Sequence, residues 1–186
     1  MNIRAVAGLL MSLGLIACQS VKTGAVAYFD NPVSVGAELE LVEPLHVPAG
    51  LARVYLQGGE IHRYAGIDQY QPFCYFLMHA PSPLGREIRP AIFSVLSIEL
   101  REQDVRLATP LRVAHNGVLA SNSDDPGVIA FETRMLLNAS KRSDPEWLVC
   151  SGAFAAPSEA APIRLAEMRL ALGSRVIVRV QGSSGP

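Results

Sequence analysis

Apolar and polar residues alternate in short runs along this chain, and this two-residue period constrains the fold more than any other feature. Glu38–Leu41 alternates strictly, and residues 91–100, Val128–Leu137 and residues 175–180 repeat the pattern. Successive side chains of a β-strand point to opposite faces, so each run builds a strand with one buried face. Turn-forming residues such as Gly58-Gly59 separate the runs. The pattern predicts about seven to nine short strands.

The order of these runs favours one fold class. Strands do not alternate regularly with helices, and no repeat period is visible. Residues 162–172 are the exception, because Pro162 suits a first helical turn and Gly173 suits a helix end; a strand is the competing interpretation. We therefore predict an all-β fold, mostly antiparallel, built as a β-sandwich or a small barrel with one short C-terminal helix.

The apolar centre of the sequence is residues 70–79, which we interpret as a buried strand. Alternation divides its side chains between two faces. One face carries Cys74, Phe76 and Met78, and the other carries Phe73, Tyr75 and Leu77. We expect these aromatic residues to belong to the core; the alternative is that they line a ligand pocket, as in some small barrels.

The first residues of the chain have the proportions of a secretory signal. Met1 and Arg4 provide positive charge, and the thirteen residues from Ala5 to Ala17 carry none. As a helix this uncharged run would be about 20 Å long, whereas a bilayer core is about 30 Å thick. The run is therefore too short for a comfortable transmembrane helix.

The end of this leader, Leu15-Ile16-Ala17-Cys18, resembles the lipobox of bacterial lipoproteins. The resemblance implies cleavage before Cys18, a diacylglycerol on its sulfur and an acylated new amino terminus. Two or more acyl chains anchor a protein stably, whereas one gives marginal binding. Gln19 in place of the aspartate of inner-membrane lipoproteins implies transport to the outer membrane. The alternatives are an ordinary signal peptide with a coincidental cysteine and an uncleaved short anchor.

These features predict the organisation of the chain. Residues 1–17 form the lipoprotein signal peptide and residues 18–24 the lipidated tether. Residues 25–181 form a single β-rich domain, which we place in the periplasm. Residues 182–186 form a flexible tail.

Two cysteines remain after the lipidation site, Cys74 and Cys150. Because the lipobox predicts an oxidising compartment, we expect a disulfide between them. Two separate buried thiols are the alternative. Metal binding would need further ligands at a recognisable spacing, and the sequence has none.

Charge excludes one class of partner. The chain has 16 basic and 17 acidic side chains, and its only lysines are Lys22 and Lys141. Without a basic tract it lacks the electrostatic signature of a nucleic-acid-binding protein. We predict no nucleic-acid partner and no cofactor.

Catalytic patterns are also missing. His46, His62, His79 and His115 are far apart in sequence, without the paired spacing of a metal site. Ser151 is the one serine we considered as a nucleophile, but its surroundings, CSGAF, lack the Gly-x-Ser-x-Gly pattern. We predict that the protein is not an enzyme.

The sequence leads to two functional hypotheses. The first is a membrane-anchored envelope lipoprotein that acts as a binding, adaptor or assembly module for an envelope protein. The second is a periplasmic carrier of a lipid or another small molecule in a β-barrel cavity. Both place the protein at the bacterial envelope, attached through its lipid to the outer membrane and facing the periplasm.

Overall fold

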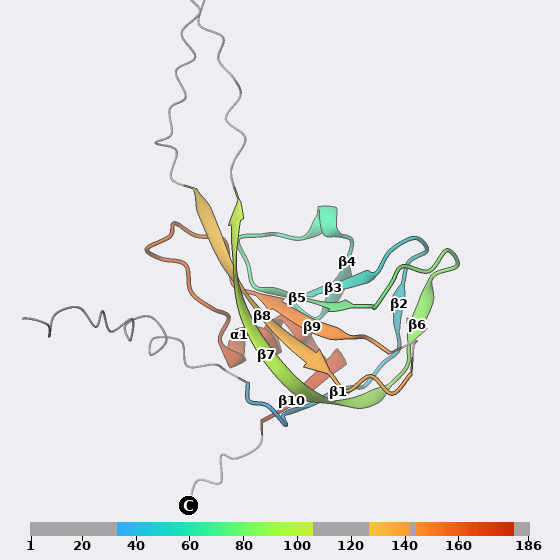
Figure 1. Cartoon of the computed structure of the whole chain (residues 1–186). Coiled ribbons are helices and arrows are strands. Elements are labelled where there is room, and N and C mark those ends of the chain that lie inside the picture. Colours follow the sequence, from blue (N-terminus) through green and yellow to red (C-terminus); the bar gives the residue numbers. More distant parts are fainter. Residues whose placement is uncertain (1–32, 106–126, 142–143, 181–186) are drawn as a thin grey trace, which may run out of the picture. The chain divides into compact units, whose positions relative to one another are not determined.

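A computed structural model describes residues 33–105, 127–141 and 144–180 (Figure 1). The chain divides into two units, Met1–Asp30 and Asn31–Pro186, and every described residue belongs to the second. The predictions for the leader, for Cys18, for residues 18–32 and for the tail at 182–186 lie outside the described residues. His115 lies outside them as well.

The described residues form ten strands, one α-helix and two short 3₁₀ helices. The strands are β1 (Glu38–Leu41), β2 (Leu45–Val47), β3 (Arg53–Gln57), β4 (Glu60–His62), β5 (Phe73–Leu77), β6 (Arg86–Ile88), β7 (Ala91–Val105), β8 (Val128–Leu137), β9 (Trp147–Ser151) and β10 (Val176–Arg179). The helices are η1 (Tyr64–Gly66), α1 (Leu165–Leu172) and η2 (Gly173–Arg175).

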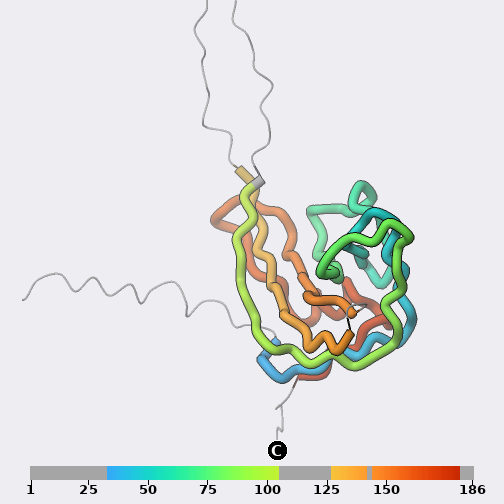
Figure 2. The backbone as a smooth tube through the Cα atoms, turned by 45° about the vertical axis from the view of Figure 1, so that its right-hand side comes forward, coloured from blue at the N-terminus to red at the C-terminus, as the bar shows by residue number. Residues whose placement is uncertain are grey.

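Eight of these strands form one curled sheet in the order β10-β1-β7-β8-β9-β5-β3-β4, and all its neighbours are antiparallel. The sheet bends into a half-barrel, and Figure 2 shows the long β7 curving around one side of it beside β8. Strands β2 and β6 pair in a separate small sheet. The prediction of a mostly antiparallel β fold with a single short helix is confirmed.

The two faces of the curled sheet have different neighbours. One face packs against α1 and forms the main core, which includes Phe76, Leu148 and Met168, each with no exposed area. We call it the covered face. The opposite face carries a smaller cluster, Tyr55, Phe73, Tyr75 and Val149, and we call it the open face.

A bulge in β7 changes which of its residues point to the covered face. The pairing with β8 shifts register between Val95 and Ser97. Phe93 and Val95 before the bulge and Ile98 after it all pack on the main core. An extra residue reverses the side-chain alternation, which is why odd-numbered residues point into the core before the bulge and even-numbered residues after it.

The disulfide predicted between Cys74 and Cys150 is confirmed. The two residues lie directly opposite each other on β5 and β9, with Cα atoms 4.0 Å apart. Both side chains belong to the covered face. The bridge therefore joins two neighbouring strands of one sheet that are 76 residues apart in sequence.

The start of the predicted helix is wrong by one turn. Helix α1 begins at Leu165, and the backbone N–H of Arg164 donates to Glu167 Oε2 at 2.8 Å. A carboxylate is stabilised there by the unpaired N–H groups of the first turn. Pro162 instead lies in an isolated bridge with Phe131 of β8. The predicted end at Gly173 is confirmed.

The end of α1 is fastened to the β3–β4 turn through two glycines with positive φ, Gly59 and Gly173. A Cβ atom at Gly173 would lie 2.4 Å from the Cα of Gly59, so only glycine fits. The N–H of Gly59 donates to the carbonyl of Ala171 at 3.0 Å, and Arg175 Nε donates to the carbonyl of Gly59 at 3.0 Å. The helix on the covered face thus fixes the position of the β3–β4 hairpin.

Two strands end at residues other than those predicted. The sequence predicts a strand over Trp147–Phe154, but β9 ends at Ser151. The next residue, Gly152, approaches the backbone of Ala161 so closely that a Cβ would lie 2.5 Å from its oxygen. Strand β7 continues beyond the predicted residue 100 to Val105. The prediction overlooked β2, β4 and β6, each of three residues, because so short a strand shows no measurable period.

Candidate functional site

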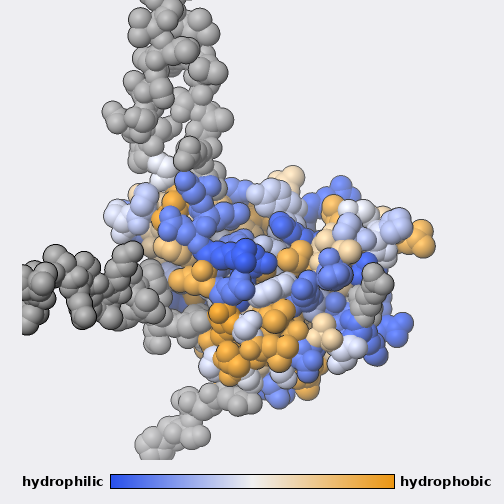
Figure 3. All heavy atoms as spheres, in the orientation of Figure 1, coloured by the Kyte–Doolittle hydropathy of each residue, from blue (hydrophilic) through white to orange (hydrophobic). Residues whose placement is uncertain are grey.

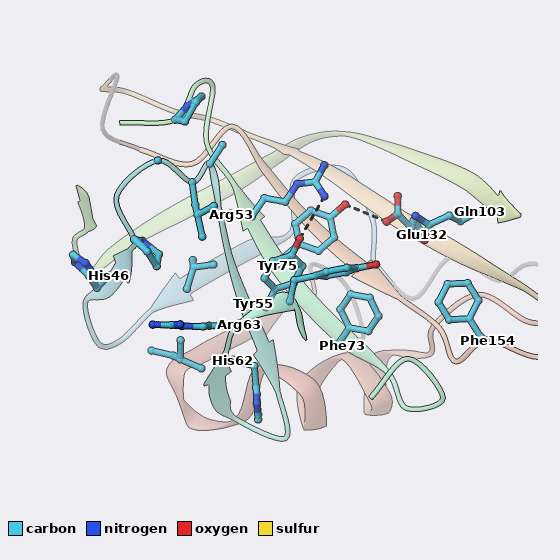
Figure 4. A pocket seen from close by; sticks show the side chains of 18 residues that line it. His46, Arg53, Tyr55, His62, Arg63, Phe73, Tyr75, Gln103, Glu132 and Phe154 are labelled. Carbon is cyan, nitrogen blue, oxygen red and sulfur yellow. Dashed lines mark hydrogen bonds between the residues drawn. The ribbon is translucent and has the colours of Figure 1, made fainter. Parts of the chain in front are cut away.

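A cavity of about 900 Å³ lies on the open face of the sheet (Figure 4). Strands β3 and β5 supply its floor through Tyr55, Phe73 and Tyr75. These residues alternate with Val54, Leu56, Cys74 and Phe76, which face the main core. The same two strands therefore build the core on one side and the cavity on the other.

The floor is an aromatic cluster centred on Tyr55. Its ring centroid lies 5.1 Å from Tyr75, 5.5 Å from Tyr64 and 6.4 Å from Phe73, with interplanar angles of 45–49°. Tilted rings at these distances pack favourably. Tyr55, Phe73 and Tyr75 are only 4–8% exposed, whereas Tyr64 is 56% exposed. Tyr64 therefore belongs to the mouth of the cavity and the others to its floor.

Two charged side chains, Arg53 and Glu132, contact the tyrosines of this floor. Arg53 Nη1 donates to the hydroxyl of Tyr55 at 3.4 Å, and its guanidinium lies 5.1 Å from the centre of the Tyr75 ring. The Tyr75 hydroxyl donates to Glu132 Oε1 at 3.1 Å. Arg53 and Glu132 therefore contact the same tyrosine, Tyr75.

The network changes two pKa values. Burial, followed by the negative charge of Glu132, raises the pKa of Tyr75 well above its ordinary value. The hydrogen bond to Tyr55 raises the pKa of Arg53. At neutral pH the Tyr75 hydroxyl therefore stays protonated and remains a donor to Glu132.

Tyr64 lies on the connection between β4 and β5, and Gln57 holds this connection in place. Gln57 Nε2 donates to the carbonyl of Asp68 at 2.8 Å, and the Asp68 N–H donates back to Gln57 Oε1 at 3.0 Å. Gln69 Nε2 donates to the Tyr64 hydroxyl at 3.1 Å, and the Phe154 N–H donates to the carbonyl of Gln69 at 2.9 Å. These bonds set the position of Tyr64 at the cavity mouth.

The two ends of the cavity differ in charge, as Figure 4 shows. His46, His62 and Arg63 lie toward one end. Gln103 and Glu132 of β7 and β8 lie toward the other, near Phe154. Among the described residues that line the cavity, Glu132 is the only acidic one.

Ser151, the candidate nucleophile of the sequence, lies in the interior of the fold. It is fully buried, and its Oγ donates to the carbonyl of Gly152 at 2.9 Å. A buried hydroxyl with its proton committed to a backbone carbonyl is poorly placed to attack a substrate.

The histidines are partly brought together. His46 and His62, 16 positions apart in sequence, line the same cavity. His79 lies elsewhere, with Nδ1 3.5 Å from Glu146 Oε2. In the described part of the chain, no group of three or more His, Cys, Asp or Glu side chains is placed to hold a metal ion.

Sequence reasoning placed Phe73 and Tyr75 in the core, with a pocket as the alternative. They are buried, as expected, but they also line the cavity. Arg53, Tyr55 and Glu132 were not identified from the sequence. The available signal was that residues 73–77 are apolar on both faces, which means that each face of this strand must be covered or must line a cavity.

No helix within residues 33–105, 127–141 and 144–180 has both the length and the apolar character needed to cross a membrane. Comparisons of the chain with models of protein families, with curated proteins and with solved structures give no match.

Proposed function

We propose that the protein is a lipid-anchored carrier or receptor of a bacterial envelope that holds one small molecule in the cavity on the open face. The observation that supports this proposal is the aromatic cavity of about 900 Å³ with its buried floor. Small-molecule sites occupy about 300–1,000 Å³ and combine mostly apolar walls with a few placed polar groups. The cavity has both properties. A cavity of this kind favours the hypothesis of a small-molecule carrier over that of a protein-binding adaptor.

The polar groups of the floor support binding rather than catalysis. Tyr55 accepts from Arg53, and Tyr75 donates to Glu132. Such mutual bonds fix the side chains before a ligand arrives, and preorganised sites lose less conformational entropy on binding. A carrier needs this rigidity and needs no activated nucleophile.

Two exposed tyrosines on the β4–β5 connection allow a matched test. Tyr64 is 56% exposed and lines the cavity, whereas Tyr70 is 62% exposed and does not. We expect the neutral fluorescent probe N-phenyl-1-naphthylamine to bind the purified protein with enhanced emission. Tyr64→Ala should weaken binding about fivefold, since one aromatic contact is worth about 1 kcal/mol. Tyr70→Ala should leave it unchanged.

Two outcomes would contradict this proposal. One is a probe that fails to bind the folded wild-type protein. The other is equal weakening by both substitutions, which would mean that binding depends on general surface apolarity. Circular dichroism of each variant confirms that the fold is kept.

The lipid anchor is proposed from the leader sequence. Leu15-Ile16-Ala17-Cys18 resembles a lipobox, so Cys18 would carry the acyl chains. Radiolabelled palmitate should enter the wild-type protein and should be absent from Cys18→Ser. Equal labelling of both would disprove the anchor without affecting the proposal for the cavity.

The adaptor remains a second candidate because one surface feature supports it. Ile92, Leu96 and Ile177 are 44–55% exposed, and Ile92 and Ile177 flank Glu40 on neighbouring strands. Figure 3 shows apolar side chains gathered over this part of the sheet. A patch of this kind suits a protein partner. A photo-crosslinking residue at Ile92 should then capture one envelope protein, whereas one at Leu170 on α1 should not.

A further inference from the structure

We infer that the ligand of the cavity is an amphiphile with an anionic head group, which lies at the end formed by His46, His62 and Arg63 while its apolar body lies on the aromatic floor. This inference rests on the proposed function, because it names the class of molecule that the same cavity would take. It is argued from three observations: the charge of each end, the lack of partners at the basic end, and the chemistry of the floor.

The basic end has free hydrogen-bonding capacity. The side chains of Arg63, His46 and His62 make no hydrogen bond or ion pair with any residue that the structure describes. A guanidinium supplies five N–H donors and an imidazole supplies one or two. These three side chains come from β2, from β4 and from the residue after β4, and all three line the same cavity.

The opposite end has its charges already paired. Glu132 accepts from Tyr75, and Arg53 lies over the ring of the same tyrosine. The acidic group therefore has a local counter-charge, and among the described lining residues the uncompensated charge is positive. A positively charged binding site attracts an anionic ligand and repels a cationic one. The lining thus selects an anion.

The floor between the ends suits an apolar body. Tyr55, Phe73 and Phe154 are 4–8% exposed, and the Tyr55 hydroxyl oxygen already accepts from Arg53. Of these three side chains only the Tyr55 hydroxyl could still donate a hydrogen bond, so a polar ligand would lose water there and gain few partners, which is unfavourable. An alkyl chain or an aromatic ring would gain about 25 cal/mol for each Å² of apolar surface removed from water.

Two other ligand classes fit less well. A cationic ligand would be repelled by the charge of Arg63, and Arg53 already lies over the ring of Tyr75. A sugar would need several acceptors as well as donors along its length, and the one carboxylate of the described lining, Glu132, already accepts from Tyr75. An anionic amphiphile uses both the apolar floor and the basic end.

Carboxylate and phosphate head groups share this chemistry, so the test includes both. Three fluorescent probes with the same chain are titrated into the purified protein: dansylaminoundecanoic acid, its methyl ester, and the corresponding dansylaminoundecyl phosphate. We expect the carboxylate or the phosphate to bind about tenfold more tightly than the ester, a difference of one charge-assisted hydrogen bond at a partly exposed site. The tighter of the two anions identifies the head group.

Substitutions then locate the head group. Arg63→Gln should reduce the preference for the anion over the ester to twofold or less and should leave the affinity for the ester unchanged. Arg89→Gln is the matched control, because Arg89 is also exposed and does not line the cavity; it should keep the full preference. High salt should weaken binding of the anions and not of the ester.

The outcomes separate this inference from the proposed function. Equal binding of ester and anions, or an anion preference that survives Arg63→Gln together with His46→Gln, would overturn the anionic head group at this end while leaving a ligand-binding cavity. Binding of none of the probes to folded protein would overturn both.

Discussion

The covered and open faces of one sheet are built by the same strands, yet they have different physical properties. On β5, Cys74 and Phe76 face α1 and have no exposed area, while Phe73 and Tyr75 face the cavity. The covered face is almost wholly apolar. The open face combines aromatic rings with Arg53 and Glu132. The comparison teaches that a helix on one side can stabilise a sheet well enough for the other side to keep a cavity lined by aromatic rings and a few charged groups.

The disulfide and helix α1 both stabilise the covered face of the sheet. Cys74–Cys150 lies on the covered face between the two floor residues Phe73 and Tyr75. Gly59 and Gly173 attach the β3–β4 hairpin to the end of α1. The cavity floor is thus positioned by contacts on the opposite face of the sheet.

The largest expected effect comes from removing one aromatic ring on each face of β5. Phe76→Ala should lower the free energy of unfolding by about 3–5 kcal/mol, because it leaves an enclosed void. Phe73→Ala should cost less, about 1.5–3 kcal/mol, because the space beside it already belongs to the cavity. Urea denaturation measures both. Equal costs would break the distinction between the two faces.

A smaller effect is expected at the junction that attaches α1. Gly173→Ala should lower the free energy of unfolding by about 1–3 kcal/mol, because its Cβ would collide with backbone and its φ of 60° disfavours other residues. Gly58→Ala, with the same φ but nothing within 4 Å, is the control and should cost about 1 kcal/mol. If the two variants are equally stable, the close contact does not hold the hairpin.

The covered face also contains one unfavourable group. Thr133 is 1% exposed, and its Oγ1 has no hydrogen-bond partner among the described residues. Thr133→Val keeps the shape and removes the buried hydroxyl, so it should raise the free energy of unfolding by about 1 kcal/mol. Thermal denaturation monitored by circular dichroism tests this. A destabilised variant would mean that the hydroxyl has a partner, such as an ordered water.

The smallest effect concerns pH and belongs to the open face. Because burial raises the pKa of Tyr75 in the folded protein, the unfolded chain loses this proton first, near pH 10. Stability from this group is therefore complete below about pH 10 and is lost as pH rises toward the folded-state pKa. Tyr75→Phe should flatten the decline in stability between pH 9 and 11, measured by urea denaturation, and Tyr70→Phe should not. An unchanged slope in Tyr75→Phe would contradict the burial of the Tyr75 hydroxyl.

Much of the covered face was predictable from local sequence. The alternation in residues 70–79 placed Cys74 and Phe76 together, and the disulfide followed from the predicted compartment. Val128–Leu137 matches β8 at both ends. These features depend on a two-residue period that is legible within a single strand.

The open face was far less predictable. Its cavity takes Arg53 from β3, Arg63 from the residue after β4 and Glu132 from β8, and only strand pairing brings them together. Nothing local marks Glu132 as the partner of Tyr75, 57 positions away. The bulge between Val95 and Ser97 also changes which residues of β7 reach this face, and periodicity alone does not locate it.

The most direct test of the central claim is a crystal structure of the protein with the tightest-binding dansyl probe. We predict electron density for one probe molecule against Tyr55 and Phe73, with its head group within hydrogen-bond distance of Arg63. Density over Ile92, Leu96 and Ile177 instead, with an empty cavity in the same crystal, would contradict the assignment of the open-face cavity as the binding site.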